Sequence, residues 1–183
     1  MIEIRIHGRG GQGAVVASKM LVTAAAKEGK KVQAFPFFGA ERRGAAVAAF
    51  ARIDDQKIRI HSEVYTPDHV IILDPMLYQS VPVTAGLKKG GLILINSPQE
   101  PSACPFPADF QVATVDAGGI ALKHKLGSRT EPIVNTAILG AFARATGIIG
   151  IEALAETIRE AIPGKAKGNE AAAREAYEKV KIR

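Results

Sequence analysis

The sequence predicts an α/β fold: three layers, α/β/α, around a mostly parallel mixed sheet that includes an antiparallel hairpin. Three observations predict it. The first 35 residues show the pattern strand–loop–helix–strand. Two strongly apolar strands follow in the middle of the chain, and helical periodicity dominates the last third. The chain has 183 residues, the length of one domain, so we expect residues 1–183 to fold as a single unit.

The spacing of apolar residues predicts a strand–loop–helix–strand unit at the N-terminus. Isoleucines at 2, 4 and 6 alternate with polar residues in IEIRIH, residues 2–7, which predicts a strand. The glycine-rich GRGGQG follows at 8–13. From residue 14 the apolar residues recur at helical spacing, and Gly29 is a typical helix stop. KVQAF at 31–35 predicts a second strand, so this Rossmann-like unit favours a parallel sheet.

The middle of the chain adds the hairpin and the buried strands. AAVAAFARI at 45–53 and IRIH at 58–61 flank the turn-like DDQK, which predicts an antiparallel hairpin. The apolar runs at 69–74 and 90–97 are expected to be strands buried on both faces. Residues 75–88 between them suit a helix that Pro82 breaks.

The last third is expected to be helical after one more strand. These elements are the strand 109–117 and the helices 118–126, 132–146, 151–162 and 170–181. Asn169 suits the N-cap of the last helix. The stretch PGKAKG at 163–168 is a possible linker to that helix.

Composition excludes several classes of protein. Cys104 is the only cysteine, which excludes a disulfide framework and any cysteine-only zinc or iron–sulfur site in this chain. The net charge is +6, but basic residues are mixed with acidic ones and only 5% of residues are aromatic, so no nucleic-acid partner is expected. No signal peptide and no apolar run long enough to span a membrane is present, so the cytoplasm is the expected location.

The glycine loop is the first motif that carries chemistry. Gly8, Gly10 and Gly13 satisfy G-x-G-x-x-G between a strand and a helix, which predicts a phosphate-bearing ligand at the helix start. The alternative is a turn that packs helix on strand without a ligand. A nicotinamide dinucleotide is disfavoured, because the second strand ends in Phe35 and Pro36 rather than in the acidic residue that holds a ribose. The Gln12 amide suits either an anion contact or a support of the loop.

The second motif is GAERRG, which follows the second strand. Phe37, Phe38, Glu41, Arg42 and Arg43 suit an interface in which arginine binds a partner carboxylate and a phenylalanine fills a pocket. A solvated loop, or direct catalysis by Glu41, are the alternatives.

No catalytic set is visible elsewhere. The four histidines are isolated in sequence, and no metal cluster is apparent. His7 precedes the glycine loop and suits either a phosphate contact or a satisfied strand end. Asn135 suits a helix cap or a structural amide. It is also a candidate residue for facing the active site or a partner subunit.

Three segments resemble the gamma subunit of 2-oxoacid:ferredoxin oxidoreductases, the family of the pyruvate, 2-oxoglutarate and ketoisovalerate enzymes: IHGRGGQGAVVASKML, KKVQAFPFFGAERRGAAVAAFARI and EPIVNTAILGAF. The resemblance covers the whole chain. It implies oxidative decarboxylation of a 2-oxoacid to acyl-CoA and CO2, with thiamine diphosphate, magnesium and [4Fe–4S] clusters delivering electrons to ferredoxin. Because this chain lacks cluster cysteines and a thiamine motif, these cofactors are expected in alpha-, beta- and delta-type partner subunits.

The resemblance also gives the motifs roles. The glycine loop becomes the expected contact for the phosphates of coenzyme A, a shared substrate: Gly8, Arg9, Gly10, Gly11, Gln12 and Gly13. Glu41, Arg42 and Arg43 become the contact toward the thiamine-bearing subunits, and no catalytic residue is assigned. The alternatives are a stand-alone nucleotide-binding dehydrogenase domain and a purely structural assembly subunit. The motifs leave the identity of the 2-oxoacid open.

Overall fold

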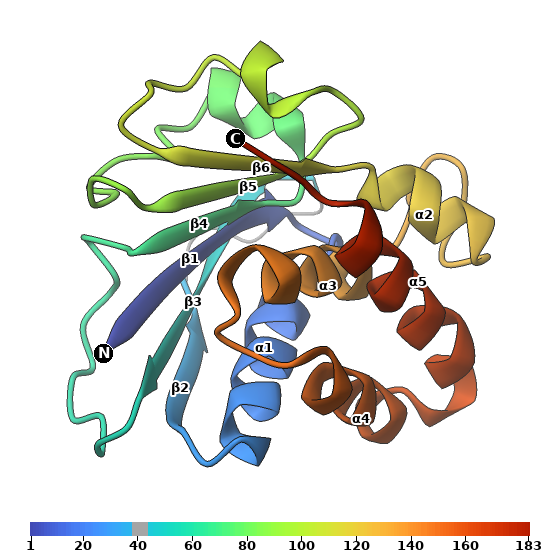
Figure 1. Ribbon diagram of the computed structural model, residues 1–183, viewed down its shortest axis with the longest axis horizontal. Coiled ribbons are helices and arrows are strands. Elements are labelled where there is room, and N and C mark those ends of the chain that lie inside the picture. Colours follow the sequence, from blue (N-terminus) through green and yellow to red (C-terminus); the bar gives the residue numbers. More distant parts are fainter. Residues whose placement is uncertain (38–43) are drawn as a thin grey trace.

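The computed structural model describes residues 1–37 and 44–183. Within them, seven strands form one sheet in the order β2-β3-β1-β4-β5-β6-β7 (Figure 1). The strands are β1 (Ile2–Arg9), β2 (Lys31–Pro36), β3 (Ala46–Asp54), β4 (His69–Ile72), β5 (Leu92–Asn96), β6 (Gln111–Val115) and β7 (Lys181–Ile182). The helices are α1 (Ala14–Lys27), α2 (Ala117–Lys123), α3 (Asn135–Thr146), α4 (Ile151–Ala161) and α5 (Ala166–Lys179).

The predicted α/β class with a mixed sheet is confirmed. β1, β4, β5 and β6 run parallel to one another, and β7 pairs antiparallel with β6. The antiparallel hairpin is present, but β2 and β3 form it. β3 also pairs antiparallel with β1 and so separates β1 from β2. The proposed pairing of 45–53 with 58–61 is therefore wrong.

Residues 58–61 form coil rather than a strand, and Arg52 of β3 binds the carbonyl oxygens at the end of this segment and directly after it. Its side chain is 1% exposed, and its Nε donates to Glu3 Oε1 at 2.8 Å. The two Nη atoms donate to the carbonyl oxygens of Ile60, Ser62 and Glu63 at 3.4, 2.7 and 3.2 Å. These carbonyls have a guanidinium partner, so the segment needs no neighbouring strand to satisfy them.

The two faces of the sheet are covered differently. The larger apolar cluster lies between the sheet and helices α1, α3, α4 and α5, which gather on one side in Figure 1. The smaller cluster includes Val70, Ile93 and Cys104, and it lies under coil and short 3₁₀ turns. The third layer is therefore made mostly of coil. Residues 75–88 contribute only the 3₁₀ turn Pro75–Gln79 rather than a helix.

The C-terminal helix packs directly on α3. Asn169 lies inside α5, where its Oδ1 accepts from Thr136 Oγ1 at 2.8 Å and its Nδ2 donates to the Lys165 carbonyl at 3.0 Å. Its expected role as N-cap is wrong, because α5 begins three residues earlier, at Ala166. Residues 163–168, considered as a linker, contain a 3₁₀ turn and the first turn of α5.

Gly140 sets the distance between α3 and α5. A Cβ at this position would overlap the carbonyl oxygen of Ala173 on α5, which is backbone that cannot rotate away. We therefore expect Gly140→Ala to lower the free energy of unfolding by about 1–3 kcal/mol through overpacking, measured by denaturant titration. The control is Gly164→Ala, where an added Cβ meets nothing within 4 Å. Equal stability of the two variants would show that the helices separate without cost.

None of the described helices is long and apolar enough to cross a membrane.

Candidate functional site

A cleft of about 670 Å³ opens at the edge of the sheet where β1 and β4 end. Arg9–Gln12, Gly44 and Asp74 form one wall, and residues from 127–133, directly before α3, form the other. Ligands of open α/β sheets bind at the carboxyl ends of parallel strands. This cleft is therefore the candidate site, and it includes four of the six residues expected from the glycine loop, defined here as residues 8–13.

The backbone of the glycine loop is mostly satisfied by the protein itself. The Gly10 N–H donates to the Ala45 carbonyl at 2.8 Å, and the Gly44 N–H donates to the Gly10 carbonyl at 3.1 Å. Gln12 Oε1 accepts from the Arg9 N–H at 2.7 Å, so this amide supports the loop. The N–H of Gly11 has no acceptor among the described residues, which leaves it available to a ligand in the cleft.

Gly8 and Gly13 shape the loop and do not line the cleft. A Cβ on Gly8 would lie 3.1 Å from Leu73 Cδ1. Gly13 has a φ of +81°, and a Cβ there would lie 2.6 Å from Asn135 Nδ2. Asn135 is 6% exposed, and its Oδ1 accepts from the Thr136 N–H at 2.9 Å. The structure thus brings Asn135 against the glycine loop, at the start of α1.

Arg9 and Asp74 form an ion pair on the wall of the cleft. Arg9 Nε lies 2.6 Å from Asp74 Oδ2, and Arg9 Nη1 donates to the Gly44 carbonyl at 3.2 Å. Asp74 Oδ1 accepts from the Met76 N–H at 2.9 Å, so it also caps the 3₁₀ turn. A carboxylate after a buried strand is typical of a cap for the next segment, and the sequence assigned Asp74 no chemistry beyond that. Its place after a parallel strand puts it on the same edge of the sheet as the glycine loop.

The opposite wall is a tight turn that sequence reasoning missed. Gly127 has a φ of +83° and forms an isolated β-bridge with Pro132. The hydroxyls of Ser128 and Thr130 lie 3.1 Å apart, and Ser128 Oγ accepts from the Glu131 N–H at 3.1 Å. A glycine followed by hydroxyl residues and a proline before a helix was the available signal.

Charge in the cleft depends on a single described cation. Among the lining residues that the structure describes, Arg9 is basic, and Asp74 and Glu131 are acidic. Arg42 and Arg43 directly precede Gly44 in the sequence, and they lie outside the described residues. How Arg9 is held therefore decides what the described part of the cleft offers to an anion.

The other expected contacts divide into three groups. Phe37 is 42% exposed beside β2, with its ring 6.4 Å from that of Phe50. His7 is 7% exposed and does not line the cleft, so it is no phosphate contact there. Phe38, Glu41, Arg42 and Arg43 lie outside the described residues.

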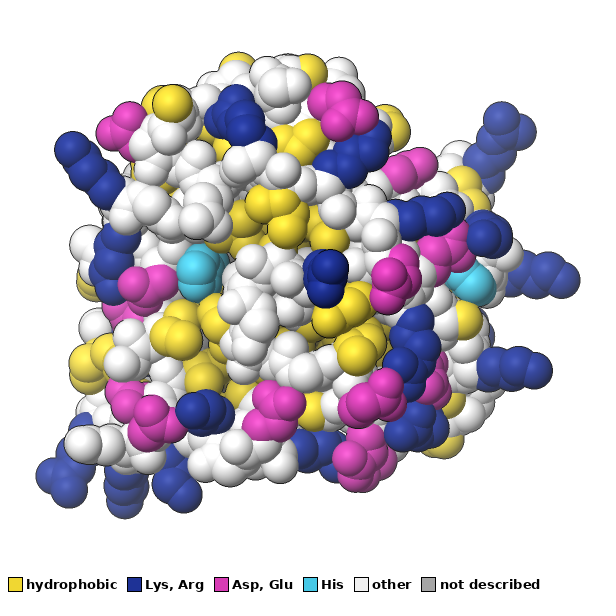
Figure 2. Space-filling view, viewed as in Figure 1, with side chains coloured by type: hydrophobic (Ala, Val, Ile, Leu, Met, Phe, Trp, Pro, Cys, Tyr) yellow, Lys and Arg dark blue, Asp and Glu magenta, His cyan; other side chains and the backbone are white. Residues whose placement is uncertain are grey.

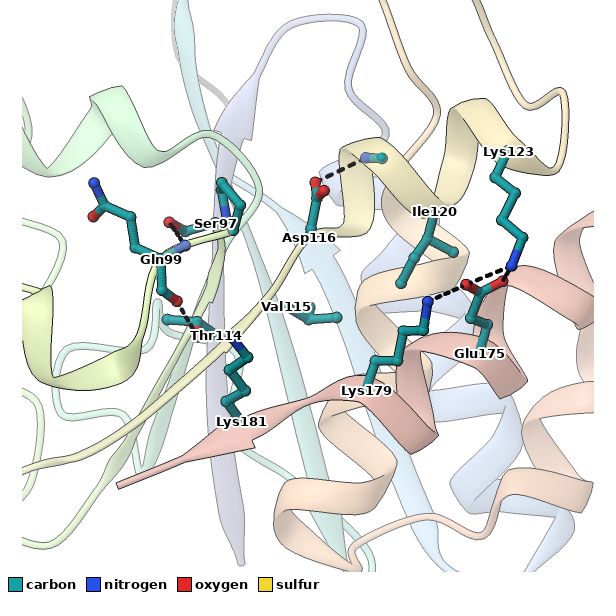
Figure 3. A pocket seen from close by; sticks show the side chains of 12 residues that line it. Ser97, Gln99, Thr114, Val115, Asp116, Ile120, Lys123, Glu175, Lys179 and Lys181 are labelled. Atoms are coloured by element: carbon teal, nitrogen blue, oxygen red, sulfur yellow. Dashed lines mark hydrogen bonds and ion pairs between the residues drawn. The ribbon is translucent and has the colours of Figure 1, made fainter.

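A second cavity, of about 490 Å³, lies where β5 and β6 end (Figure 3). Lys179 and Lys123 bond the carboxylate of Glu175 at 2.7 and 2.9 Å, and Figure 3 shows both side chains turned toward it. Together with His124 they lower the pKa of Glu175 to about 2. Lys181 pairs with Glu100. Each of the three lysines is thus paired with one of the protein's own carboxylates, and we assign no ligand to this cavity.

The described residues contain no metal site, and the face shown in Figure 2 has no patch of a single charge sign. The residues 1–37 and 44–183 contain no group of three or more His, Cys, Asp or Glu placed to hold a metal ion. On the face shown in Figure 2, lysine and arginine are mixed with aspartate and glutamate, and apolar side chains lie between them.

Comparison with known proteins identifies the family. The family model described as "Pyruvate ferredoxin/flavodoxin oxidoreductase" matches residues 3–179. The chain belongs to this family. The "Pyruvate/ketoisovalerate oxidoreductases common subunit gamma" of Thermococcus kodakarensis is 53% identical, with 100% of this chain and 98% of the relative covered. The "Pyruvate synthase subunit PorC" of Methanothermobacter marburgensis is 52% identical, with 99% and 98% covered.

Two solved structures share the fold. The pyruvate oxidoreductase subunit PORC of Thermotoga maritima aligns with a TM-score of 0.83 and 38% identity, covering 99% of this chain and 97% of that one. The 2-oxoglutarate:ferredoxin oxidoreductase of Magnetococcus marinus aligns with a TM-score of 0.75 and 23% identity, covering 97% of this chain and 30% of that one. The prediction of a gamma-type subunit of a 2-oxoacid:ferredoxin oxidoreductase is confirmed, and such a subunit works within a multi-subunit oxidoreductase.

Proposed function

We propose that this gamma-type subunit binds the phosphates of coenzyme A in the cleft between the glycine loop and residues 127–133. One observation carries the proposal: Gly11 N–H and the guanidinium of Arg9 line a cleft at the carboxyl ends of parallel strands. Backbone N–H groups and arginine are the donors that phosphate selects. The related Magnetococcus marinus enzyme, which shares the fold, is described with coenzyme A bound.

The cleft fits this ligand better than it fits a dinucleotide. Its volume of about 670 Å³ lies within the usual range of small-molecule sites. In a dinucleotide-binding fold the second strand lies beside the first, and the ligand crosses the crevice at that point. Here the antiparallel strand β3 lies beside β1. Ala45, the residue before β3, accepts a hydrogen bond from the Gly10 N–H through its carbonyl oxygen. These features favour coenzyme A over the stand-alone dehydrogenase.

The remaining chemistry belongs, in this proposal, to partner subunits in the cytoplasm. Alpha-, beta- and delta-type subunits carry thiamine diphosphate, magnesium and the [4Fe–4S] clusters, and they pass electrons to ferredoxin. The chain alone supplies no catalytic residue and is inactive. Phe37, Phe38, Glu41, Arg42 and Arg43 make the contact toward the thiamine-bearing subunits, and Asn135 supports the glycine loop beneath the ligand.

The test compares two glycines that differ mainly in location. Gly11 has a φ of +99° and Gly29 a φ of +85°, and an added Cβ meets nothing within 4 Å at either. Alanine should therefore strain the backbone similarly at both positions, by about 1–2 kcal/mol. We expect Gly11→Ala, and not Gly29→Ala, to raise the KM for coenzyme A of the assembled enzyme. A Cβ in the cleft blocks the approach of a phosphate to the backbone N–H, and loss of one such contact to a charged group raises the KM by about tenfold or more.

Steady-state kinetics with each substrate varied in turn measures this effect. The KM for the 2-oxoacid should stay unchanged in both variants, and thermal melts should match. An unchanged KM for coenzyme A in well-assembled Gly11→Ala enzyme would contradict the proposal and favour a purely structural subunit.

A further inference from the structure

We propose that Asp74 is a positioning residue that holds Arg9 in place for a phosphate of coenzyme A; this inference rests on the function proposed above. Both side chains line the cleft, and their ion pair joins the carboxyl end of β1 to the segment after β4. Asp74 does not contact the ligand itself in this arrangement. It acts through the direction that it gives to the guanidinium.

The Asp74 side chain is held by a contact that does not involve Arg9. Its Oδ1 accepts from the Met76 N–H at 2.9 Å, which ties the carboxylate to the turn after β4. Its side chain is 16% exposed, so the pair lies in a partly desolvated place where it is stronger than on an open surface. The other carboxylate oxygen, Oδ2, accepts a hydrogen bond from Arg9 Nε at 2.6 Å. The carboxylate is therefore a rigid anchor rather than a mobile counterion.

The contact with Asp74 sets the orientation of the Arg9 guanidinium, because this group is planar. Nε is held by Asp74 and Nη1 by the Gly44 carbonyl at 3.2 Å. Since the group is planar, these two contacts also fix Nη2. Among the described residues nothing accepts from Nη2, and the Arg9 side chain is 36% exposed where it lines the cleft. One edge of the guanidinium is thus held ready as a charge-assisted donor.

This arrangement explains how Asp74 can lie on the wall of a cleft that binds an anion. The charge of Asp74 is compensated by Arg9, while Arg9 keeps unused N–H groups, because a guanidinium carries five. A phosphate that meets Nη2 gains an oriented donor without an entropy cost for ordering a long side chain.

The experiment uses the assembled oxidoreductase with Asp74→Asn, Arg9→Ala and the double variant. Asparagine keeps an oxygen that accepts from the Met76 N–H, but it removes the charge that holds Arg9. We expect Asp74→Asn to raise the KM for coenzyme A by about tenfold or more, as for loss of one charge-assisted hydrogen bond, with the 2-oxoacid KM unchanged. Because Asp74 acts through Arg9, the double variant should have the same KM as Arg9→Ala.

Asp68→Asn is the matched control. Asp68 lies before the other end of β4, where its Oδ2 accepts from the Glu3 N–H at 2.8 Å and its Oδ1 pairs with Lys88 at 2.7 Å. It therefore has the same double engagement away from the cleft, and its variant should leave the coenzyme A KM unchanged. A KM raised equally by Asp68→Asn would overturn the inference, because the effect would then be a general loss of stability.

The outcomes separate this inference from the function on which it rests. If Arg9→Ala raises the coenzyme A KM and Asp74→Asn does not, the positioning role is wrong and the coenzyme A cleft stands. If the two effects multiply in the double variant, Asp74 acts independently of Arg9 and the inference is also wrong. If neither variant changes the KM, both the inference and the proposed contact at Arg9 fail.

Discussion

Arg52→Met is expected to lower the free energy of unfolding by about 3–5 kcal/mol, the cost of removing one partner of a buried charge pair. The substitution leaves Glu3, whose side chain is 14% exposed, without its cation. It also leaves the carbonyls of Ile60, Ser62 and Glu63 without their donor. Arg52→Lys should not restore the stability, because one ammonium group cannot replace a planar guanidinium that donates to several acceptors in different directions. Denaturant titration of the full chain measures the change.

A second arginine provides the control for this substitution. Arg59 is exposed, so Arg59→Met should change stability by no more than about 0.5 kcal/mol. Limited proteolysis should in addition cut Arg52→Met chains within the coil 57–66 before the sheet unfolds. If Arg52→Met and Arg59→Met prove equally stable, the guanidinium does not hold this coil.

The free energy of unfolding is expected to decrease by about 3 kcal/mol as the pH falls from 6.5 to 4, because His7 becomes protonated. Burial and, secondly, the charge of Arg5 lower the pKa of His7 from 6.5 to about 4, while a hydrogen bond with the backbone of Val83 acts in the opposite direction. The neutral ring accepts from Arg5 Nε at 3.0 Å. Because the pKa is lower in the folded chain, the unfolded chain binds the proton first as the pH falls, and folding loses free energy across this window.

About 2 kcal/mol of the loss due to His7 falls between pH 7 and pH 5. Burial also lowers the pKa of His69, which adds a loss in this range that a His7 variant retains, so the difference between wild type and variant isolates the effect of His7. Carboxylates with lowered pKa values, such as Glu175, act mainly below this range. His7→Gln keeps an acceptor for Arg5 and should flatten the dependence, whereas His61→Gln, at an exposed position, should not. A wild-type chain equally stable at both pH values would show that His7 titrates normally.

Much of the sheet could be predicted because its strands carry local signals. The alternation in IEIRIH and the apolar run at 69–74 identified β1 and β4 within a few residues. The partner of β3 could not be predicted in this way. IRIH at 58–61 alternates as a strand does, but the carbonyl oxygens of Ile60, Ser62 and Glu63 accept from the Arg52 side chain. A contact of this kind, made by one long side chain from a distant strand, leaves no signal in the local periodicity.

The candidate site was predictable on one side only. The glycine pattern pointed to Arg9–Gln12, because tight turns at a strand end require glycine. Asp74 and the turn at 127–131 reach the same cleft from distant parts of the chain. Their contribution depends on the parallel pairing of β1 with β4 and on the packing before α3, which follow from tertiary structure rather than from a motif.

The position of β3 between β1 and β2 has a consequence for the order of assembly. Among the described strands, β2 shares hydrogen bonds with β3 alone. Pro36 and Ala49, which face each other in the β2–β3 pair, are 13 residues apart, whereas Arg9 and Ala46 in the β1–β3 pair are 37 apart. Loop-closure entropy makes the longer connection about 1 kcal/mol more costly. We therefore expect the hairpin to form before it docks on β1, and the glycine loop to gain its contacts with Gly44 and Ala45 only after the hairpin is present.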